Sequence, residues 1–210
     1  MPGCEHEHVG HGHDHDHDHE SSDEPTKDFL FECIDLDNVR VLNSTDPTSG
    51  TRLIKPWHRR NDTTEIVESD ADDQLILHVP FTGSVRLHAI LLRGFPDDTA
   101  PKSLKVYINQ EDVDFEGVEE STPTQEWELA QGASEVSDYR VRASKFANVH
   151  AITLFFPESF GGEVAKLSFL GFRGDWLQAK KEPVITVYEA RPNVKDHKVP
   201  GANTMNHSLM

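Results

Sequence analysis

The feature that most constrains the fold is the stretch from 68 to 94, ESDADDQLILHVPFTGSVRLHAILLRG, in which an acidic turn leads into two apolar runs separated by Pro80 and Gly83. Apolar residues alternate in both runs, as expected of strands packed on a core. They are Leu75, Leu77 and Val79 in the first run and Val85, Leu87, Ala89 and Leu91 in the second. Ile76, Ile90 and Leu92 make the opposite faces apolar as well. We therefore predict central strands that are covered on both sides, as in a sandwich of two sheets.

Further short apolar segments, separated by turn residues, follow the same pattern along the chain. They lie at 39–42, 104–108, 125–129, 139–142, 149–156, 164–172 and 184–189. Because no long helical pattern lies between them, they predict an all-β fold, an antiparallel jelly-roll sandwich. We expect Gly161-Gly162 to be a hairpin connection between two of these strands. Asp62 and Glu65 form a capping-box pattern, which predicts a short helical turn through Glu68.

The length of 210 residues suits one domain with a sizeable core and two tails. We expect a disordered His/Asp-rich tail at 1–24, a folded domain at 25–192 and a flexible C-terminal tail at 193–210. No apolar run reaches the roughly 20 residues that span a bilayer, and the N-terminus lacks the pattern of a secretion signal. Together with only two cysteines, this predicts a cytoplasmic protein that can also enter the nucleus.

The formal net charge of −17 argues against two classes of partner. Nucleic acids and anionic membranes both carry negative charge, which the field of such a protein would repel. Residues 1–28 carry nine acids and one Lys, so about half of the charge imbalance lies in the N-terminal segment. The remaining chain is acidic too.

The N-terminal segment also contains the low-complexity run HEHVGHGHDHDHDHE, which begins at His6. Imidazole and carboxylate groups are ligands for zinc, copper and nickel, so weak metal binding is chemically reasonable. The alternative is a solvated tail whose metal affinity is incidental, since no rigid frame fixes a coordination geometry. We favour the second interpretation and expect no cofactor. The candidate metal ligands are His11, His13, His15, His17 and His19.

The densest cationic cluster lies in KPWHRR, which begins at Lys55. Trp57 could anchor an interface, with His58, Arg59 and Arg60 beside it. Alternatively, the arginines could pair with acids of the stretch that follows (Glu68, Asp70, Asp72, Asp73) while the tryptophan seals the sandwich. Surface ion pairs typically contribute only about 0 to 1 kcal/mol, so stability alone is a poor reason to concentrate them. We therefore hypothesise a partner-binding role for Lys55, Trp57, His58, Arg59 and Arg60.

The chain contains none of the common short signatures of hydrolases, nucleotide-binding enzymes or zinc peptidases, so we expect no enzyme. Three histidines within apolar strands (His78, His88, His150) are expected to be hydrogen-bonded or surface residues rather than ligands. The Arg173-Gly174-Asp175 sequence is expected to be a strand end and turn, with Trp176 packed. Cys33 is expected to be a small buried apolar residue.

Several motifs occur in an order that resembles the PITH domain, the proteasome-interacting thioredoxin domain family. They are IKPWHRRND, ESDADDQLI, PTQEWEL, SKFANVHAITL, FLGFRGDW and YEARPNVKDHK, and the resemblance covers about residues 28 to 200. It implies a jelly-roll core akin to galactose-binding-like domains, in a cytoplasmic or nuclear protein. In thioredoxin-containing relatives this domain docks on the proteasome. This chain has no thioredoxin domain and no Cys-x-x-Cys pair, so a disulfide-reductase role is not implied.

The expected function is that of a monomeric, noncatalytic adaptor that binds the proteasome or a related assembly. Two alternatives stay open, a small-ligand or carbohydrate-binding module and a metal-handling protein that uses the His-rich tail. The polar end YEARPNVKDHK is hypothesised to be a docking element in which Asp196 and His197 contact the partner. A strap that packs across the sandwich edge is the alternative for this segment.

Overall fold

The computed structural model describes residues 28–110, 114–131 and 135–177. Its strands are β1 (Arg40–Leu42), β2 (Val67–Glu68), β3 (Leu75–Arg93), β4 (Ser103–Ile108), β5 (Gln125–Glu128), β6 (Ser137–Arg140), β7 (Val149–Phe156), β8 (Lys166–Leu167) and β9 (Phe169–Leu177). The α-helices are short, α1 (Ser49–Leu53) and α2 (Phe115–Glu120), and η1 (Phe31–Cys33), η2 (Leu36–Asn38) and η3 (Trp57–Arg59) are 3-10 turns. Within these residues no helix is long and apolar enough to cross a membrane.

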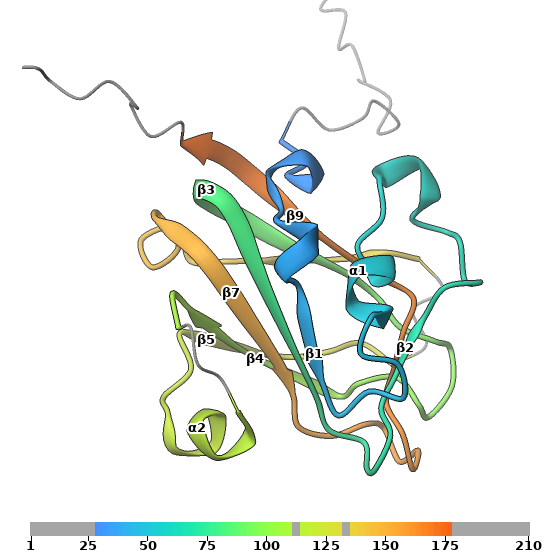
Figure 1. Ribbon diagram of the computed structural model, residues 1–210. Helices are drawn as coiled ribbons and strands as arrows, with labels where there is room; N and C mark the ends of the chain where they lie inside the picture. Colours follow the sequence, from blue (N-terminus) through green and yellow to red (C-terminus); the bar gives the residue numbers. More distant parts are fainter. Residues whose placement is uncertain (1–27, 111–113, 132–134, 178–210) are drawn as a thin grey trace, which may run out of the picture. The chain divides into compact units, whose positions relative to one another are not determined.

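The two predicted central strands are one strand, β3, which belongs to both layers of the sandwich (Figure 1). Its first half pairs with β1 and β7, and β4 and β5 continue that layer beyond β7. Its second half pairs with β6 and β9 in the other layer. The register with β7 shifts between Pro80 and Val85, where the strand passes from one layer to the other. All pairings between these strands are antiparallel, which confirms the predicted antiparallel jelly-roll sandwich.

The predicted alternation holds in the first half of β3 and changes phase in the second. Leu75, Leu77 and Val79 lie in the main core, and so do Val85 and Leu87. The register with β9 then shifts between Leu87 and Ala89, so His88 is an extra residue in the strand. After this bulge the main core contains Ile90 and Leu92. Ala89 and Leu91 are buried on the other face, so their assignment to the main core face was wrong.

The first half of β3 is covered on its second face as well. Ile76 packs with Tyr107, Val118 and Phe155 in a separate small cluster. Val118 comes from α2, and the Tyr107 hydroxyl donates a hydrogen bond to the Val118 carbonyl at 2.7 Å. The burial of Tyr107 raises its pKa. The prediction that Ile76 faces a second apolar layer is therefore correct.

The acidic turn before β3 is held by an asparagine from the end of β1. Asn43 has a positive φ of 59°, a conformation that asparagine tolerates better than most residues. Its side-chain amide donates to the Asp72 carboxylate and the Gln74 carbonyl, both at 2.7 Å, and accepts from the Ala71 backbone at 3.0 Å. The Asp72 carboxylate therefore helps to hold the conformation of this turn.

Two local predictions are wrong. Gly161-Gly162 does not connect a hairpin, because β7 pairs with β3 and β4 whereas β9 pairs with β3 in the other layer. Residues 62–66 form no helix, and Val67–Glu68 is strand β2, paired with β8. The predicted strand at 184–189 and the predicted tails at 1–24 and 193–210 lie outside the described residues.

Candidate functional site

The loop from 55 to 66 is fixed from within by Lys55. Its side chain is 1% exposed, and its ammonium donates to the carbonyls of Asp62 and Glu65 at 2.7 Å and of Ser168 at 3.0 Å. Burial lowers the pKa of Lys55, while the Asp62 and Glu65 carboxylates oppose that shift. Three carbonyls use the three donors of an ammonium group. Lys55 therefore holds the loop against the strand region around Ser168 and is not itself an exposed contact residue.

Trp57 lies where the loop meets the sandwich. Its ring contacts Phe29 edge-on at 5.9 Å between centroids and Phe169 at 6.3 Å. The Arg60 guanidinium lies over the ring, 4.4 Å from its centroid, in the geometry of a cation–π contact. Trp57 is half-buried, in contact with Phe169 of the sandwich and beside Arg60. Its role as an interface anchor stays a prediction.

Arg59 is paired within its own loop. Its guanidinium lies 2.7 Å from the Asp62 carboxylate and 3.1 Å from Glu65, and the bond to Asp62, followed by the charge of Glu65, raises its pKa. Asp62 accepts from both the backbone and the hydroxyl of Thr64, in an Asx turn. These hydrogen bonds from Thr64 lower the pKa of Asp62, and the hydrogen bond from Arg59 lowers it further. The turn explains why the capping pattern produces no helix here.

Three of the four acids predicted as partners of this cluster are engaged elsewhere. Glu68 pairs with Lys166 at 3.3 Å, Asp73 accepts from the Ser159 backbone at 2.7 Å, and Asp72 binds Asn43. The exposed members are His58 and Arg59, and Arg60 is half-exposed. We call Trp57, His58, Arg59 and Arg60 the Trp57 surface.

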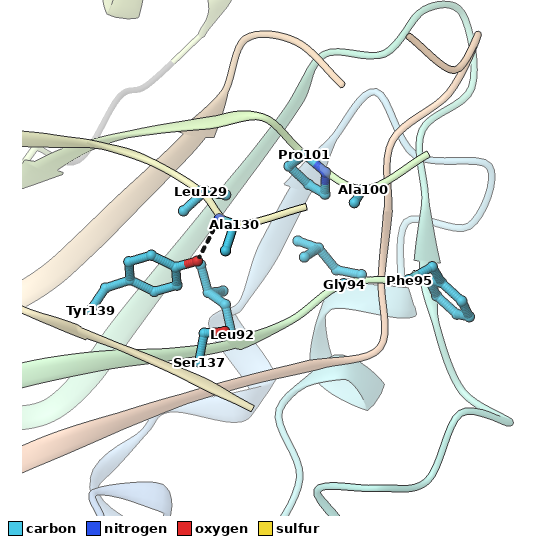
Figure 2. Close-up of a pocket in the computed structure, with 10 residues that line it drawn as sticks. Leu92, Gly94, Phe95, Ala100, Pro101, Leu129, Ala130, Ser137 and Tyr139 are labelled. Atoms are coloured by element: carbon cyan, nitrogen blue, oxygen red, sulfur yellow. Dashed lines mark hydrogen bonds between the residues drawn. The ribbon is translucent and has the colours of Figure 1, made fainter. Parts of the chain in front are cut away.

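A small pocket lies near one end of β6 (Figure 2). Its volume is about 20 Å³, which is room for about one water molecule. Figure 2 shows Tyr139 reaching across to Ala130, whose backbone N–H donates to the Tyr139 hydroxyl at 3.3 Å. Apolar side chains such as Leu92 and Leu129 make up most of the rest of the lining. The pocket is too small for a sugar or a cofactor.

A larger hollow of about 230 Å³ lies over the outer face of the β6–β3–β9 layer. Two of its lining residues, His88 and Arg173, were expected to have other roles, and no site was predicted here. A sequence signal existed nearby, because Arg140, Arg142 and Lys145 form a second run of cations at the end of β6 and just beyond it. The hollow is lined by Asp28, His88, Ala89, Asp138, Arg140 and Arg173.

The three strand histidines are placed as predicted. His78 is buried and its Nδ1 lies 3.0 Å from the Thr153 hydroxyl. His88 and His150 are exposed, and His88 Nε2 lies 3.3 Å from the Asp175 carboxylate. No group of three or more potential metal ligands occurs in the part of the chain that the structure describes. The candidate ligands His11, His13, His15, His17 and His19 and the docking residues Asp196 and His197 lie outside it.

The predictions for Arg173–Trp176 and for Cys33 need correction. Arg173 to Trp176 lie within β9 and form no turn. Gly174 is required there because a Cβ atom would overlap the Arg86 carbonyl oxygen. Trp176 is 49% exposed, with its indole nitrogen over Gly83. Cys33 is only half-buried; burial, with the Glu32 charge as a smaller cause, raises the pKa of its thiol.

Comparison with known proteins identifies the family. The profile of the PITH domain matches residues 20–192. A PITH domain-containing protein of Schizosaccharomyces pombe is 39% identical over 173 residues, which are 81% of this chain and 84% of that protein. One from Drosophila melanogaster is 36% identical over 200 residues, 94% of each chain. PITH domain-containing protein 1 of Homo sapiens is 33% identical over 181 residues, 86% of this chain and 85% of that protein.

A solved structure is similar in fold only. A family 89 glycoside hydrolase from Clostridium perfringens, in complex with 2-acetamido-1,2-dideoxynojirmycin, superposes with a TM-score of 0.50 and 13% identity. The superposition covers 70% of this chain and 14% of that chain. Because unrelated functions share such sandwiches, this similarity assigns no ligand. The profile match and the relatives, by contrast, extend over most of the sequence, and this chain belongs to the PITH domain family.

Proposed function

We propose that the chain is a noncatalytic protein-interaction module that associates with the proteasome or a related assembly in the cytoplasm or nucleus. The observation that carries this proposal is the Trp57 surface, in which an aromatic ring packs against the core residue Phe169 and is covered by Arg60. Tryptophan and arginine are among the residues enriched at the energetic centre of protein interfaces. Family membership supplies the candidate partner, because the sequence resembles a family named for interaction with the proteasome.

The Trp57 surface is prepared for binding before a partner arrives. Lys55 closes the loop through three hydrogen bonds, and Asp62 and Glu65 hold Arg59. A preformed loop loses less conformational entropy on association than a mobile one, which favours affinity. Arg60 also donates to the Trp57 carbonyl at 3.2 Å, so its stacked position is supported twice.

Affinity purification with the full chain tests this proposal. The native chain should enrich proteasome subunits, and the double variant His58→Ala/Arg60→Ala should lose most of that enrichment. Arg52→Ala is the matched control, because Arg52 is exposed and pairs with Asp46 outside the Trp57 surface. Failure of the native chain to enrich proteasome subunits, under conditions where a thioredoxin-containing relative does so, would remove the proposal.

The hypothesis of a C-terminal docking element needs separate variants. Truncation after Ala190 and the substitution His197→Ala should both reduce proteasome capture if Asp196 and His197 contact the partner, and both should leave the melting temperature unchanged. Capture equal to that of the native chain would assign binding to the Trp57 surface alone. A lower melting temperature of the truncated chain would indicate a strap instead.

A further inference from the structure

A second cationic surface lies at the end of β6 and on the loop that follows it. Arg140, Arg142 and Lys145 are all exposed. Among the described residues none of the three forms an ion pair, and the Lys145 ammonium donates only to the Thr124 carbonyl, at 2.8 Å. In contrast, the exposed Arg59 and Lys102 each face a carboxylate. In a protein with a net charge of −17, three adjacent cations without acidic partners need an explanation.

One of these cations, Arg140, lines the hollow of about 230 Å³. In the register of the sheet, Ala89 of β3 is paired with Arg140 on one side and Arg173 on the other, so two arginines flank a methyl side chain. Arg173 is already held, because its guanidinium donates to Asp28 and Asp138, each at 3.0 Å. The planar guanidinium of Arg140 is therefore the available donor, and such groups recognise carboxylates with two parallel hydrogen bonds.

The loop that carries Arg142 and Lys145 is attached to the same region of β3. The Val141 backbone N–H donates to the His88 carbonyl at 3.0 Å, and the Leu87 N–H donates to the Phe146 carbonyl at 2.9 Å. Arg142 and Lys145 lie between these two attachment points in the sequence. We call Arg140, Arg142, Lys145 and the adjoining hollow the β6 surface.

Asp28 is the point where the N-terminal segment is attached to the sandwich. It lines the hollow and is also the first residue that the structure describes, so the preceding chain is joined at the rim of the hollow. Its position is fixed, because its carbonyl accepts from the Gly174 N–H at 2.7 Å and its carboxylate from Arg173. Residues 1–27 contain eight acids and one Lys. Because these residues are covalently attached at Asp28, binding at the surface would be intramolecular, so weak charge contacts are enough.

We propose that the β6 surface is a carboxylate-binding surface and that its occupant is the chain's own acidic N-terminal segment, residues 1–27. The carboxylates of this segment pair with Arg140, Arg142 and Lys145. This inference does not depend on proteasome binding, because its occupant is part of the same chain.

A spin label on Cys4 of the full chain tests the inference, with Cys33→Ala leaving Cys4 as the labelling site. Amide signals of the isotope-labelled chain are compared with the label oxidised and reduced. We expect loss of amide signal at residues 137–145 and at His88 and Ala89 when the label is oxidised. The signals should recover at about 1 M salt, where the Debye length is about 3 Å.

Variants separate binding at the β6 surface from simple proximity of the attached segment. With the label oxidised, the triple variant Arg140→Ala/Arg142→Ala/Lys145→Ala should keep its amide signals at these residues. The matched triple variant Arg52→Ala/Arg59→Ala/Arg60→Ala should lose them, as the native chain does. Equal signal loss in the two triple variants would overturn the inference, and so would loss centred on residues 57–60. Loss that occurs only when labelled and isotope-labelled chains are mixed would show binding between copies and would also overturn it.

Discussion

Replacing Lys55 by methionine should lower the free energy of unfolding by about 2 to 3 kcal/mol. Methionine resembles the apolar stem of lysine but lacks the ammonium, which leaves three carbonyls without this donor. Ser168 is fully buried, so its carbonyl is left unsatisfied, at a cost of about 1 to 3 kcal/mol. The carbonyls of Asp62 and Glu65 are only partly buried and can bind water, so the loss of each hydrogen bond lowers the stability by about 0.5 to 1.5 kcal/mol. Loss of the desolvation penalty of the buried charge offsets part of this sum.

Urea unfolding followed by tryptophan fluorescence measures the change. Lys102→Met is the matched control, because Lys102 is an exposed lysine whose ammonium faces only Glu158, and the expected change there is within about 0.5 kcal/mol. If Lys55→Met is as stable as the native chain, the buried ammonium does not hold the loop, and the reasoning about a preformed Trp57 surface fails.

The pH dependence gives a second readout of the same group. The pKa of Lys55 is lower in the folded protein than its ordinary value of 10.5. Between these two values the unfolded chain binds more protons at this site than the folded chain, so stability rises with pH in that window. The native chain should therefore gain stability relative to Lys55→Met as the pH rises towards 10.5. A constant difference between the two proteins would contradict the direction of the shift.

Three further predictions concern the sandwich itself. Leu77→Ala and Leu91→Ala should each lower the free energy of unfolding by about 2 to 5 kcal/mol in urea, since both side chains are buried; a change below about 0.5 kcal/mol for both would place them at the surface. Gly174→Ala should lower the free energy of unfolding by about 1 to 3 kcal/mol because the new methyl group overlaps the Arg86 carbonyl. A melting temperature equal to that of the native chain would show that the two strands can move apart there. Deletion of residues 1–24 should preserve cooperative thermal unfolding, and its loss would mean that the domain begins earlier.

The fold was predictable because its strongest signals are local. Alternation around Leu77 and the short apolar segment at 149–156 both appear as strands in the structure. The phase change at His88 was not predictable, because a bulge adds one residue without changing the composition of the run. The failed hairpin at Gly161-Gly162 has a similar origin, since a turn signal does not say which strands pair.

The candidate site was only partly predictable. The run at Lys55–Arg60 drew attention to the loop that forms the Trp57 surface, but sequence cannot show that Lys55 points inwards while Arg60 stacks on Trp57. The ion pairs of Arg59 with Asp62 and Glu65 are local, yet their geometry depends on the Asx turn at Thr64. The β6 surface depends on strand register, which brings Arg140 and Arg173 to the same small residue.

Titration of the fluorescently labelled full chain with purified proteasome, followed by anisotropy, tests the proposed function most directly. We predict saturable binding that Arg60→Ala weakens at least tenfold, which corresponds to about 1.4 kcal/mol, while Arg52→Ala binds as the native chain does. Thermal melts of both variants must match that of the native chain, so that lost binding reflects the surface. The absence of saturable binding, or equal affinities for Arg60→Ala and Arg52→Ala, would contradict the assignment of the Trp57 surface.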